Sequence, residues 1–323
     1  MRRGLVIGKF LPVHLGHIAL IDFAASRCDE LIVSMSFTDM DPISPDLRLT
    51  WLKEIFHNRK KITVYTIRDD FDAELLPWLQ RTQIWADVIR AAYPEIHVLF
   101  SSEEYGTPFA HNLGVDHIVF DLPRTRHPVS ASLIRKYPFK YWDYIPREVR
   151  PFFVKKVCFF GPESTGKTVL AEKLAMEFDT EWVPEVAREM LTSNSFSLED
   201  IVNIGCAHHA RVKGKLSLAN KLLICDTDAI TTQIYSRHYL GEVPDILSQL
   251  ERDVQIDFYF LFDIDVPWVA DGLRDLGHLR KEMFDIFEGE LVKRHAPYMI
   301  VRGNYEARHK LVHKKLKEIL NDY

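Results

Sequence analysis

Two short stretches of this 323-residue sequence combine glycines with cationic or imidazole side chains at spacings that suit phosphate chemistry. One of them, GPESTGKT, fits the pattern G-x-x-x-x-G-K-[ST] through Gly161, Gly166, Lys167 and Thr168. It follows the apolar run KKVCFF and precedes the amphipathic segment TVLAEKLAMEF, which is the strand–loop–helix setting of a P-loop. In that setting backbone N–H groups wrap the phosphates, Lys167 bridges the β- and γ-phosphates, and Thr168 can ligate Mg²⁺. The predicted ATP-binding loop also includes Pro162, Glu163, Ser164 and Thr165.

Acidic side chains follow two other apolar runs in the second half of the chain. KLLICDTD ends in Asp226 and Asp228, and EWVPEVARE places Glu185 three residues before Arg188. Carboxylates at the carboxyl ends of parallel strands face the ligand crevice of an open α/β sheet. We therefore expect Asp226 to be a catalytic and metal-binding acid and Glu185 to be the general base. Arg188 and Asp228 are the expected substrate-binding partners. The alternatives are a helix N-cap for the aspartate and a solvated helical pair for Glu185 and Arg188.

A basic segment, WVADGLRDLGHLRKE, carries Arg274, Arg280 and Lys281 before the final helix-strand-helix. Such a segment can act as a lid that brings cations to the transferred phosphoryl group and excludes water. We expect Arg274 to contact ATP in this way, and a solvated basic helix is the alternative. The later stretch VRGNYEAR is expected to place Asn304 in a loop near the base of the nucleotide.

The second stretch with phosphate chemistry is GKFLPVHLGH, residues 8–17, which follows the apolar run GLVIG and leads into a helix-periodic segment. His14 and His17 therefore sit at or just before a helix N-terminus. Imidazoles there can donate hydrogen bonds to phosphate oxygens beside free backbone N–H groups. We expect both histidines to be catalytic by offsetting charge on a transferring phosphorus. The same turn supplies the expected ATP contacts Gly8, Lys9 and Phe10.

A matching anion site is expected near the end of the first half, in HPVSASLIRKY. Ser130 and Ser132 lie at another expected helix start, and Arg135 lies one turn inside that helix. Hydroxyl groups, backbone N–H groups and a fixed guanidinium suit a triphosphate tail. We predict that the two serines bind ATP and that Arg135 takes part in catalysis.

Ten apolar, β-rich runs alternate with helix-periodic segments along the chain, five in each half. This is the βα signature of parallel sheets, so we predict an α/β fold with two doubly wound sheets. The linker DYIPREVRPFFVKK places prolines among charged residues. We set the boundary there, with a nucleotidylyltransferase domain at residues 1–150 and a P-loop kinase domain at residues 151–323.

Composition restricts the partners of the protein. The sequence is 47% hydrophobic and 27% charged with a net charge of −5, and no stretch is long and apolar enough for a membrane span. A net negative charge gives no field that attracts polyanions, so we expect neither nucleic acid nor a membrane as a partner. The four cysteines fall singly in or beside apolar runs, which favours reduced thiols and a cytoplasmic protein.

The two histidine- and serine-containing motifs resemble those of the nucleotidylyltransferase superfamily, whose members carry H-x-G-H and I-S-x-[ST]-x-[IL]-R. Val129 stands where isoleucine is usual in the second motif. An adenylyltransferase half upstream of a P-loop kinase half resembles the bifunctional NadR family over essentially the whole chain. The segments SSEEYG, CDTDAITTQ and WVADGLRDLG are similar to segments of that family. Some members carry an N-terminal helix-turn-helix domain, whereas the first predicted strand here begins within five residues of the start, so repression through DNA is not implied.

The resemblance implies a two-step route to NAD. The second half would phosphorylate nicotinamide riboside with ATP, and the first half would transfer the adenylyl group of a second ATP to the resulting nicotinamide mononucleotide (NMN), with Mg²⁺ assisting. A cationic pyridinium gains from an aromatic face, so the implied substrate contacts are Trp85 or Trp78 in the first half and Trp268 or Tyr298 in the second.

Two other functions compete with this interpretation. A coenzyme A pair would join a phosphopantetheine adenylyltransferase to a dephospho-CoA kinase, but it would share only the P-loop with the kinase half seen here. A non-catalytic NAD or ATP sensor would not need to retain both sets of charge-handling residues. A homo-oligomer stays open as the state of assembly.

Overall fold

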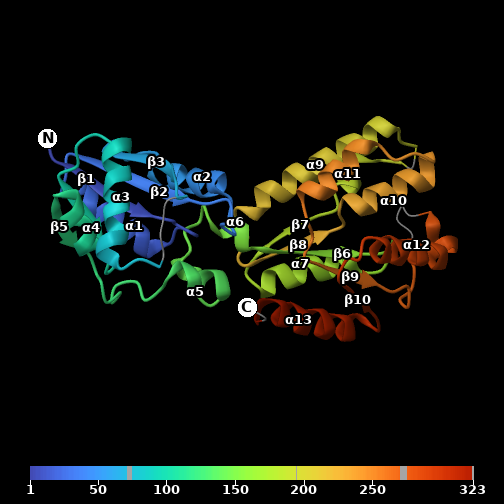
Figure 1. Cartoon of the computed structure of the whole chain (residues 1–323). Coiled ribbons are helices and arrows are strands. Elements are labelled where there is room, and N and C mark those ends of the chain that lie inside the picture. The colour runs from blue at the N-terminus through green and yellow to red at the C-terminus, as the bar shows by residue number, and fades with distance from the viewer. Residues whose placement is uncertain (71–74, 194, 270–274, 322–323) are drawn as a thin grey trace. The chain divides into compact units, whose positions relative to one another are not determined.

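The chain divides after Arg150 into two units, each built around its own parallel sheet (Figure 1). The computed structural model describes residues 1–70, 75–193, 195–269 and 275–321. Each of the ten apolar runs predicted from the sequence overlaps one of the strands β1–β10, and every recorded strand pairing is parallel. The predicted α/β class with two doubly wound sheets is confirmed.

The first unit follows a repeating order of strand and helix. Its elements are β1 (Arg3–Gly8), α1 (Leu15–Ala25), β2 (Glu30–Phe37), α2 (Pro45–Phe56), β3 (Ile62–Arg68), α3 (Trp78–Ala92), β4 (Val98–Ser101), α4 (Gly106–Leu113), β5 (Asp116–Val119), α5 (Ala131–Lys136) and the 3₁₀ turn η1 (Trp142–Tyr144). The strand order is β3-β2-β1-β4-β5. The order reverses between β1 and β4, and such a switch point opens a crevice at the carboxyl ends of the strands.

Alternation along β4 shows how helices cover both faces of the first sheet. Leu99 packs in a core with residues of α3 and α4, whereas its neighbour Phe100 contacts Phe23 of α1 at a ring separation of 6.2 Å. Successive strand residues point to opposite faces, so α1 lies on the face away from α3 and α4. The turn that joins β1 to α1 therefore lies at the switch point, and α1 covers the face of the sheet opposite α3 and α4.

The second unit repeats the plan with a different strand order. Its elements, after the short α6 (Arg150–Phe153), are β6 (Lys155–Phe160), α7 (Lys167–Glu177), β7 (Glu181–Val183), α8 (Ala187–Met190), α9 (Leu198–Leu216), β8 (Leu222–Asp226), α10 (Ala229–Leu240), α11 (Asp245–Asp253), β9 (Phe258–Phe262), η2 (Leu276–Leu279), α12 (Arg280–Lys293), β10 (Tyr298–Val301) and α13 (Tyr305–Asn321). The strand order β10-β9-β6-β8-β7 puts β6, and hence the P-loop that follows it, at the centre.

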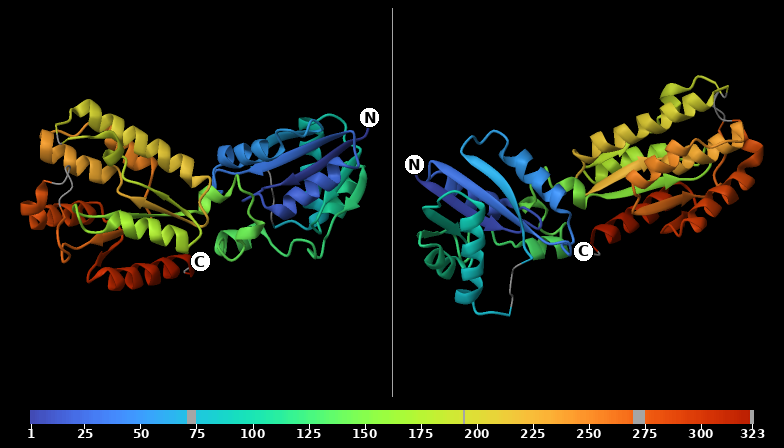
Figure 2. Two further views of the ribbon diagram at one scale, coloured as in Figure 1. Left: turned by 180° about the vertical axis from the view of Figure 1, so that it is seen from behind. Right: turned by 45° about the horizontal axis from the view of Figure 1, so that its top comes forward.

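Two separate cores cover the faces of the second sheet. Phe159 belongs to a core with α7 and α13, and the adjacent Phe160 belongs to a core with α10 and α12. The left panel of Figure 2 shows α7 and α13 together on one side of this sheet, with α9 on the other side. Because β6 is buried on both faces from Val157 to Phe160, this part of its sequence is continuously apolar instead of alternating.

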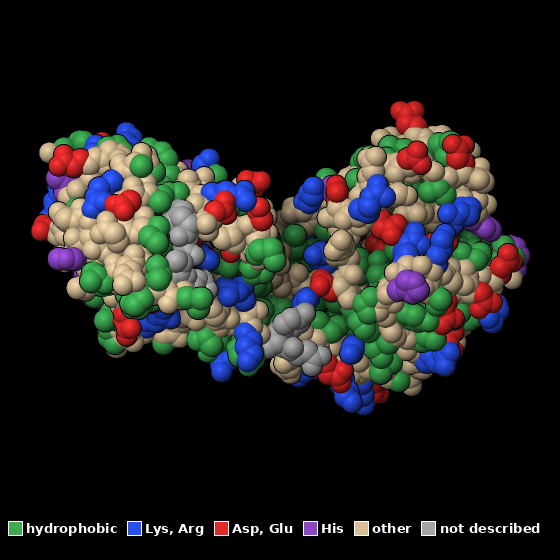
Figure 3. All heavy atoms as spheres, in the orientation of Figure 1, with side chains coloured by type: hydrophobic (Ala, Val, Ile, Leu, Met, Phe, Trp, Pro, Cys, Tyr) green, Lys and Arg blue, Asp and Glu red, His purple; other side chains and the backbone are tan. Residues whose placement is uncertain are grey.

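The distribution of surface charge and the hydropathy of the helices are consistent with the amino-acid composition. On the face drawn in Figure 3, acidic and basic side chains are interspersed over each unit, so the excess of acid is not gathered into one patch there. None of the helices within the described ranges is both long and apolar enough to cross a membrane.

Candidate functional sites

The first site is built on the turn between β1 and α1, where two histidines cap the helix. His14 is the N-cap residue: its Nδ1 accepts from the Gly16 N–H at 3.1 Å, and the His14 N–H donates to Nδ1 of His17 at 3.3 Å. A ring nitrogen that accepts a hydrogen bond carries no proton, so both neutral rings carry theirs on Nε2. The rings stack with centroids 3.8 Å apart. The cap therefore fixes two neutral imidazoles as Nε2–H donors, which are the groups an anionic phosphate requires.

A glycine is required in this turn because the chain approaches itself closely. A Cβ atom on Gly16 would lie 3.0 Å from the His14 ring and 3.5 Å from Cβ of His127. A side chain at this position would therefore force the capping imidazole to shift.

The predicted anion-binding residues of the first unit line one pocket at the switch point. Its walls include His14 and His17 together with Gly8, Lys9, Ser130 and Ser132. Ser130 caps α5 by accepting from the Leu133 N–H at 3.2 Å. Arg135 does not line the pocket itself. Its guanidinium donates to the Leu11 carbonyl and, at 3.3 Å, to Ser132 Oγ, so it ties the serine motif to the histidine turn.

The sequence analysis missed several pocket residues on the loop after β5. Arg124 lines the pocket, pairs with Glu103 at 2.6 Å and adopts a positive φ of 53°. His127 and Tyr105 also line it. Tyr105 is the N-cap of α4 and lies within the stretch SSEEYG, and His127 begins the stretch HPVSASLIRKY, but neither was predicted as a site residue. Arg124 lies outside the quoted motifs, and a non-glycine residue held at positive φ beside a ligand pocket is a sign of function that the backbone reveals.

The predicted aromatic contacts of the first unit lie beside this pocket but are not among its lining residues. Phe10 is buried, and its ring packs edge to face on His17, so its side chain supports the histidine. Trp85 is partly buried and contacts the rings of Trp78 and Tyr105 at 6.1 and 5.3 Å. Among these rings Tyr105 lines the pocket. A substrate-binding role for Trp85 stays a prediction.

The capping histidines should make the first unit sensitive to acid. Burial, followed by the charge of Arg124, lowers the pKa of His17 to about 3, and burial lowers the pKa of His14 still further. Between pH 6.5 and 3 the unfolded chain therefore binds protons that the folded unit does not bind. The free energy of unfolding accordingly decreases as the pH is lowered through that window. We expect His17 to account for about 1–2 kcal/mol of lost stability between pH 6.5 and 5. His17→Asn, which keeps an acceptor for the cap, should lose less.

The measurement is thermal unfolding of both proteins at pH 7.5 and pH 5. His57→Asn is the control, because this imidazole is exposed at the end of α2. Equal pH dependence in the wild-type protein and His17→Asn would contradict the proposed neutral state of His17.

The second site is the P-loop between β6 and α7. Position 161 requires glycine for two reasons. Its φ is 128°, and a Cβ there would lie 2.9 Å from the Phe262 carbonyl oxygen. Lys167 Nζ donates to the carbonyls of Gly161 and Pro162 at 2.8 and 2.7 Å. Burial lowers the pKa of Lys167, while the nearby carboxylates of Asp226 and Glu185 favour its charged form. The lysine charge is thus held in place by the loop and by two acids.

Asp226 and Thr168 meet across the crevice. Asp226 is the last residue of β8 and is fully buried, and its Oδ2 accepts from Thr168 Oγ1 at 2.5 Å. Burial raises the pKa of Asp226 to about 6, and Lys167 opposes the rise. Asp226 Oδ1 is buried without a hydrogen-bond partner among the described residues. A hydroxyl and a carboxylate with an unused oxygen fit Mg²⁺, which is typically bound by one or two carboxylates, substrate phosphates and water.

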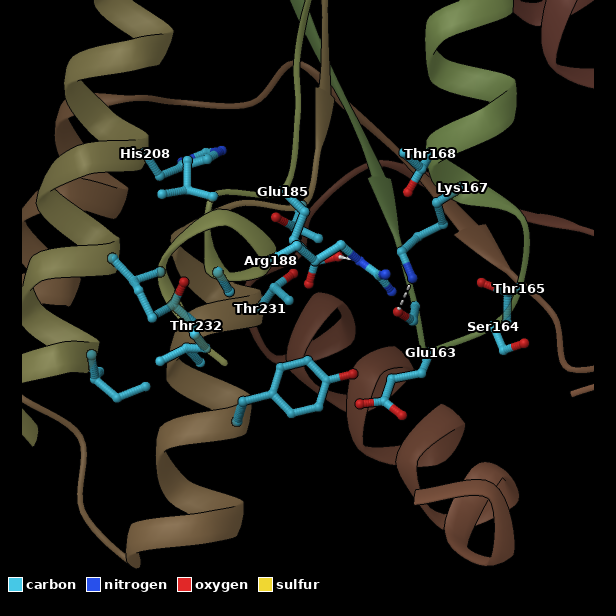
Figure 4. Close-up of a pocket in the computed structure, with 18 of the residues that line it drawn as sticks. Glu163, Ser164, Thr165, Lys167, Thr168, Glu185, Arg188, His208, Thr231 and Thr232 are labelled. Carbon is cyan, nitrogen blue, oxygen red and sulfur yellow. Dashed lines mark hydrogen bonds and ion pairs between the residues drawn. The ribbon is translucent and has the colours of Figure 1, made fainter. Parts of the chain in front are cut away.

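Glu185 and Arg188 form an ion pair in the wall of the same pocket. Arg188 Nε donates to Glu185 Oε2 at 2.7 Å. Figure 4 shows this pair opposite Lys167 and Glu163, from separate elements of the second unit. Burial and then Asp275 raise the pKa of Glu163 to about 7. The structure therefore brings two carboxylates, a guanidinium and the P-loop lysine to one cavity.

Other predicted residues of the second unit lie elsewhere. Asp228 caps α10: its Oδ1 accepts from the Thr231 N–H at 2.9 Å, and its Oδ2 accepts from Tyr259 at 2.8 Å. It lines a small neighbouring cavity and not the P-loop pocket. Its carboxylate is therefore occupied by hydrogen bonds within the protein. A helix N-cap was the alternative role that the sequence analysis considered for an aspartate of KLLICDTD. A substrate-binding role for Asp228 stays a prediction.

The remaining predicted residues are placed as follows. Asn304 is exposed and accepts from the Ala307 N–H at 3.0 Å at the start of α13. Trp268 packs on Gly277, where a Cβ would lie 2.9 Å from its ring, and Tyr298 donates to Glu288 at 2.9 Å. Neither ring lines the P-loop pocket. Arg274 lies outside the described residues.

Sequence reasoning missed the far wall of the P-loop pocket. Its lining residues on α8, α9, α10 and the connecting loop include Leu191, Phe196, Ile201, Ile204, His208, Thr231, Thr232, Tyr235 and Tyr239. Tyr235 and Tyr239 lie one turn apart on α10, and this i,i+4 spacing of aromatic residues was the available signal.

Both phosphate-binding turns are braced by a buried arginine from a distant element. Arg48 of α2 donates to the Lys9 carbonyl at 2.6 Å and pairs with Asp41 at 2.7 Å. Arg308 of α13 donates to the Thr165 carbonyl at 2.5 Å and to the Asp263 carbonyl at 2.8 Å, and its guanidinium also pairs with Asp265. A planar guanidinium can satisfy several carbonyls at once, which a lysine ammonium cannot do in the same directions.

Replacing Arg308 with lysine should therefore weaken both folding and nucleotide binding in the second unit. We expect a loss of about 2–4 kcal/mol, because buried carbonyls and Asp265 lose their donors. Thermal unfolding and calorimetric binding of a non-hydrolysable ATP analogue measure the two effects. Arg302→Lys is the matched control, since Arg302 is exposed and pairs with Asp263 at the surface, where about 1 kcal/mol or less is expected. Equal effects of the two substitutions would refute the bracing role.

Together, the two sheets and their phosphate-binding turns define a two-unit α/β protein of the nucleotide-binding class. A sequence profile described as "AAA domain" matches residues 156–308. The trifunctional NAD biosynthesis/regulator protein NadR of Escherichia coli K12 is 34% identical over 298 residues, covering 85% of this chain and 72% of that protein. The chain belongs to the NadR family, and the resemblance drawn from its motifs is confirmed.

Further relatives agree with this membership. A nicotinamide-nucleotide adenylyltransferase of Methanocorpusculum labreanum is 28% identical over 158 residues, which are 46% of this chain and 88% of that enzyme. A crystal structure of a NadR protein in complex with NR has a TM-score of 0.84 at 20% identity, and one with NAD and AMP-PNP has 0.82 at 22%. Both cover 99% of this chain and 96% of theirs. At these identities the likeness concerns the fold.

Proposed function

We propose that the protein is a bifunctional NAD salvage enzyme that carries out two successive transfers from ATP. The second unit phosphorylates the 5′-hydroxyl of nicotinamide riboside, and the first unit joins the resulting mononucleotide to the adenylyl group of another ATP. The observation that carries the proposal is the presence, in one NadR-family chain, of two phosphate-binding turns on two separate sheets, each with its own cationic or imidazole donors.

In the kinase step the 5′-oxygen attacks the γ-phosphorus of ATP, the bond to the β,γ-bridging oxygen breaks, and ADP leaves. Glu185 takes the hydroxyl proton, and its ion pair with Arg188 orients it toward the pocket. Lys167 offsets the charge of the transferred group beside the N-terminus of α7. Mg²⁺ held by Thr168 and Asp226 would neutralise phosphate charge when bound.

In the adenylyl step a phosphate oxygen of the mononucleotide attacks the α-phosphorus of ATP, and pyrophosphate leaves. No covalent enzyme intermediate is required. The Nε2–H groups of His14 and His17 donate to the reacting phosphate, and Lys9 supplies positive charge. Ser130 and Ser132 hold the β- and γ-phosphates, and Arg135 fixes their helix against the histidine turn.

Incubation with ATP and nicotinamide riboside tests the proposal directly. We expect ADP and the mononucleotide to form first, followed by NAD and pyrophosphate, as resolved by chromatography. Phosphopantetheine and dephospho-CoA are the parallel substrates, and turnover of these alone would favour the coenzyme A pair. Tight NAD binding without release of pyrophosphate would instead support a sensor. A cytoplasmic location and the need for Mg²⁺ stay part of the proposal.

A further inference from the structure

The P-loop pocket is lined by charged side chains at one end and by apolar side chains at the other. One end carries Lys167, Thr168 and the Glu185–Arg188 pair, whereas the other is walled by Leu191, Phe196, Ile201 and Ile204. If the pocket holds a riboside, as the proposed function requires, the reacting hydroxyl must lie at the charged end. The heterocyclic base then lies against the apolar wall on α9 and its preceding loop.

A buried imidazole on α9 interrupts that wall. His208 lies on α9, one turn beyond Ile204, and only 8% of it is exposed. Figure 4 shows its imidazole extending away from the axis of α9, and His208 is among the residues that line the pocket. Its Nε2 is buried and has no hydrogen-bond partner within the described part of the chain. A buried polar atom left unsatisfied is costly, so a bound group that satisfies it is favoured.

The tautomer of His208 follows from its other contact. The imidazole hydrogen-bonds to the backbone of Thr227 in a way that favours its protonated form, so the ring is the donor and the Thr227 carbonyl is the acceptor. The Thr227 N–H is already used on the Phe159 carbonyl. Since Nε2 is the nitrogen without a partner, Nδ1 carries the proton and Nε2 presents a lone pair.

The ring also stays neutral. Burial, followed by the charges of Arg211 and His209, lowers the pKa of His208 to about 4. Thr227 adopts a φ of 80°, a costly conformation for a β-branched residue, and this conformation holds the carbonyl that fixes the ring. The imidazole of His208 therefore adds a neutral hydrogen-bond acceptor to the apolar wall on α9.

A neutral acceptor distinguishes the two common forms of the pyridine base. The carboxamide of nicotinamide offers two N–H donors, whereas the carboxylate of nicotinic acid offers acceptors alone and loses hydration on burial. Arg188 lines the same pocket, but its Nε is paired with Glu185 at 2.7 Å, so part of its positive charge is offset within the protein before a substrate binds.

We propose that Nε2 of His208 accepts a hydrogen bond from the carboxamide of nicotinamide riboside and so selects the amide over the carboxylate form of the substrate. This assignment rests on the proposed kinase function and deepens it. His208 is a specificity residue and not a catalytic one, since the reacting hydroxyl lies at the other end of the pocket.

The substrate itself provides the first test. In 3-acetylpyridine riboside a methyl group replaces the amide nitrogen, which removes the donors and keeps the size and carbonyl. With the wild-type enzyme we expect kcat/KM to be about 10- to 100-fold lower for this analogue than for nicotinamide riboside, and lower still for nicotinic acid riboside. Equal kcat/KM for the amide and the acetyl compound would overturn the assignment without any variant.

Variants supply the second test. His208→Leu should lower kcat/KM for nicotinamide riboside by about 10- to 100-fold, with little change for the acetyl analogue, so that the ratio approaches one. His208→Gln, whose carbonyl oxygen can replace Nε2, should retain much of the preference. His209→Leu is the matched control: it removes an imidazole from the same helix that does not line the P-loop pocket, and it should leave the ratio unchanged.

Two further readouts separate the possible failures. Formation of NAD from NMN by the first unit should be unchanged in each variant, which reports intact folding there. Binding of a non-hydrolysable ATP analogue should be unchanged as well, which reports an intact P-loop. If nicotinamide riboside is phosphorylated but His208→Leu preserves the ratio, only the role of His208 is wrong. If no riboside is phosphorylated by the wild-type protein, the proposed kinase function is wrong, and the assignment of His208 falls with it.

Discussion

Replacing Lys167 with alanine is expected to abolish phosphorylation of nicotinamide riboside and to leave the conversion of NMN to NAD intact. The ammonium lies in the P-loop between the carbonyls of Gly161 and Pro162 and beside Asp226. In a dry site such a charge stabilises the transferred phosphoryl group far more than it could in water. We expect kcat/KM of the kinase step to fall by about 10³-fold or more.

The same substitution should also disturb Asp226. Lys167 opposes the rise in the pKa of this buried carboxyl group, so its removal should raise that pKa further and weaken the hold on Mg²⁺. Titration of Mg²⁺ against nucleotide binding would therefore show weaker coupling in Lys167→Ala. Thr50→Ala is a control in the other unit, at an exposed hydroxyl that bonds its own helix at 2.9 Å. A Lys167→Ala protein that is folded but has lost both activities would contradict two independent sites.

The reciprocal substitution, His17→Ala, is expected to silence adenylyl transfer and spare the kinase. The loss should be about 10²–10³-fold in kcat/KM, the usual cost of removing one preorganised donor to a transition-state charge. Alanine also removes the acceptor for the His14 N–H, which is part of the helix cap and contributes about 0.5–2 kcal/mol.

A second variant separates donation from capping. His17→Asn retains an acceptor close to the position of Nδ1 but has no group at the position of Nε2. If Nε2–H acts on the reacting phosphate, the asparagine variant should be nearly as inactive as the alanine variant while regaining stability in thermal unfolding. Pyrophosphate release measures the activity. An active His17→Asn protein would assign His17 a purely structural role.

Motifs that occupy one continuous stretch were predictable because their chemistry is local. A P-loop needs glycines at set positions and a lysine at the helix start, and the sequence 161–168 provides them within one turn. The strands were equally predictable, since each overlaps a short apolar, β-rich run, and such a run is continuous where a strand is buried on both faces. The histidine and serine motifs were correctly placed at helix starts, because helix capping is also a local interaction. His14 and Ser130 are both N-cap residues that accept from backbone N–H groups.

Residues that reach a site across the fold were not predictable in this way. Arg308 is 143 residues from the P-loop carbonyl it supports, and no spacing rule connects them. His208 sits within a helix that reads as an ordinary amphipathic segment. Asp228 was expected in the same crevice as Asp226, but β8 ends at Asp226, Thr227 adopts a φ of 80°, and Asp228 caps α10.

The sequence by itself determined which elements form, where the phosphate-binding turns lie and to which family the chain belongs, because backbone geometry and helix capping depend on neighbouring residues. The tertiary structure decided which nitrogen of each histidine carries a proton, which acids face the phosphates and which side chains wall the base pocket. Those properties depend on burial and on hydrogen bonds between distant segments, and they exist only once the helices have packed on their sheets.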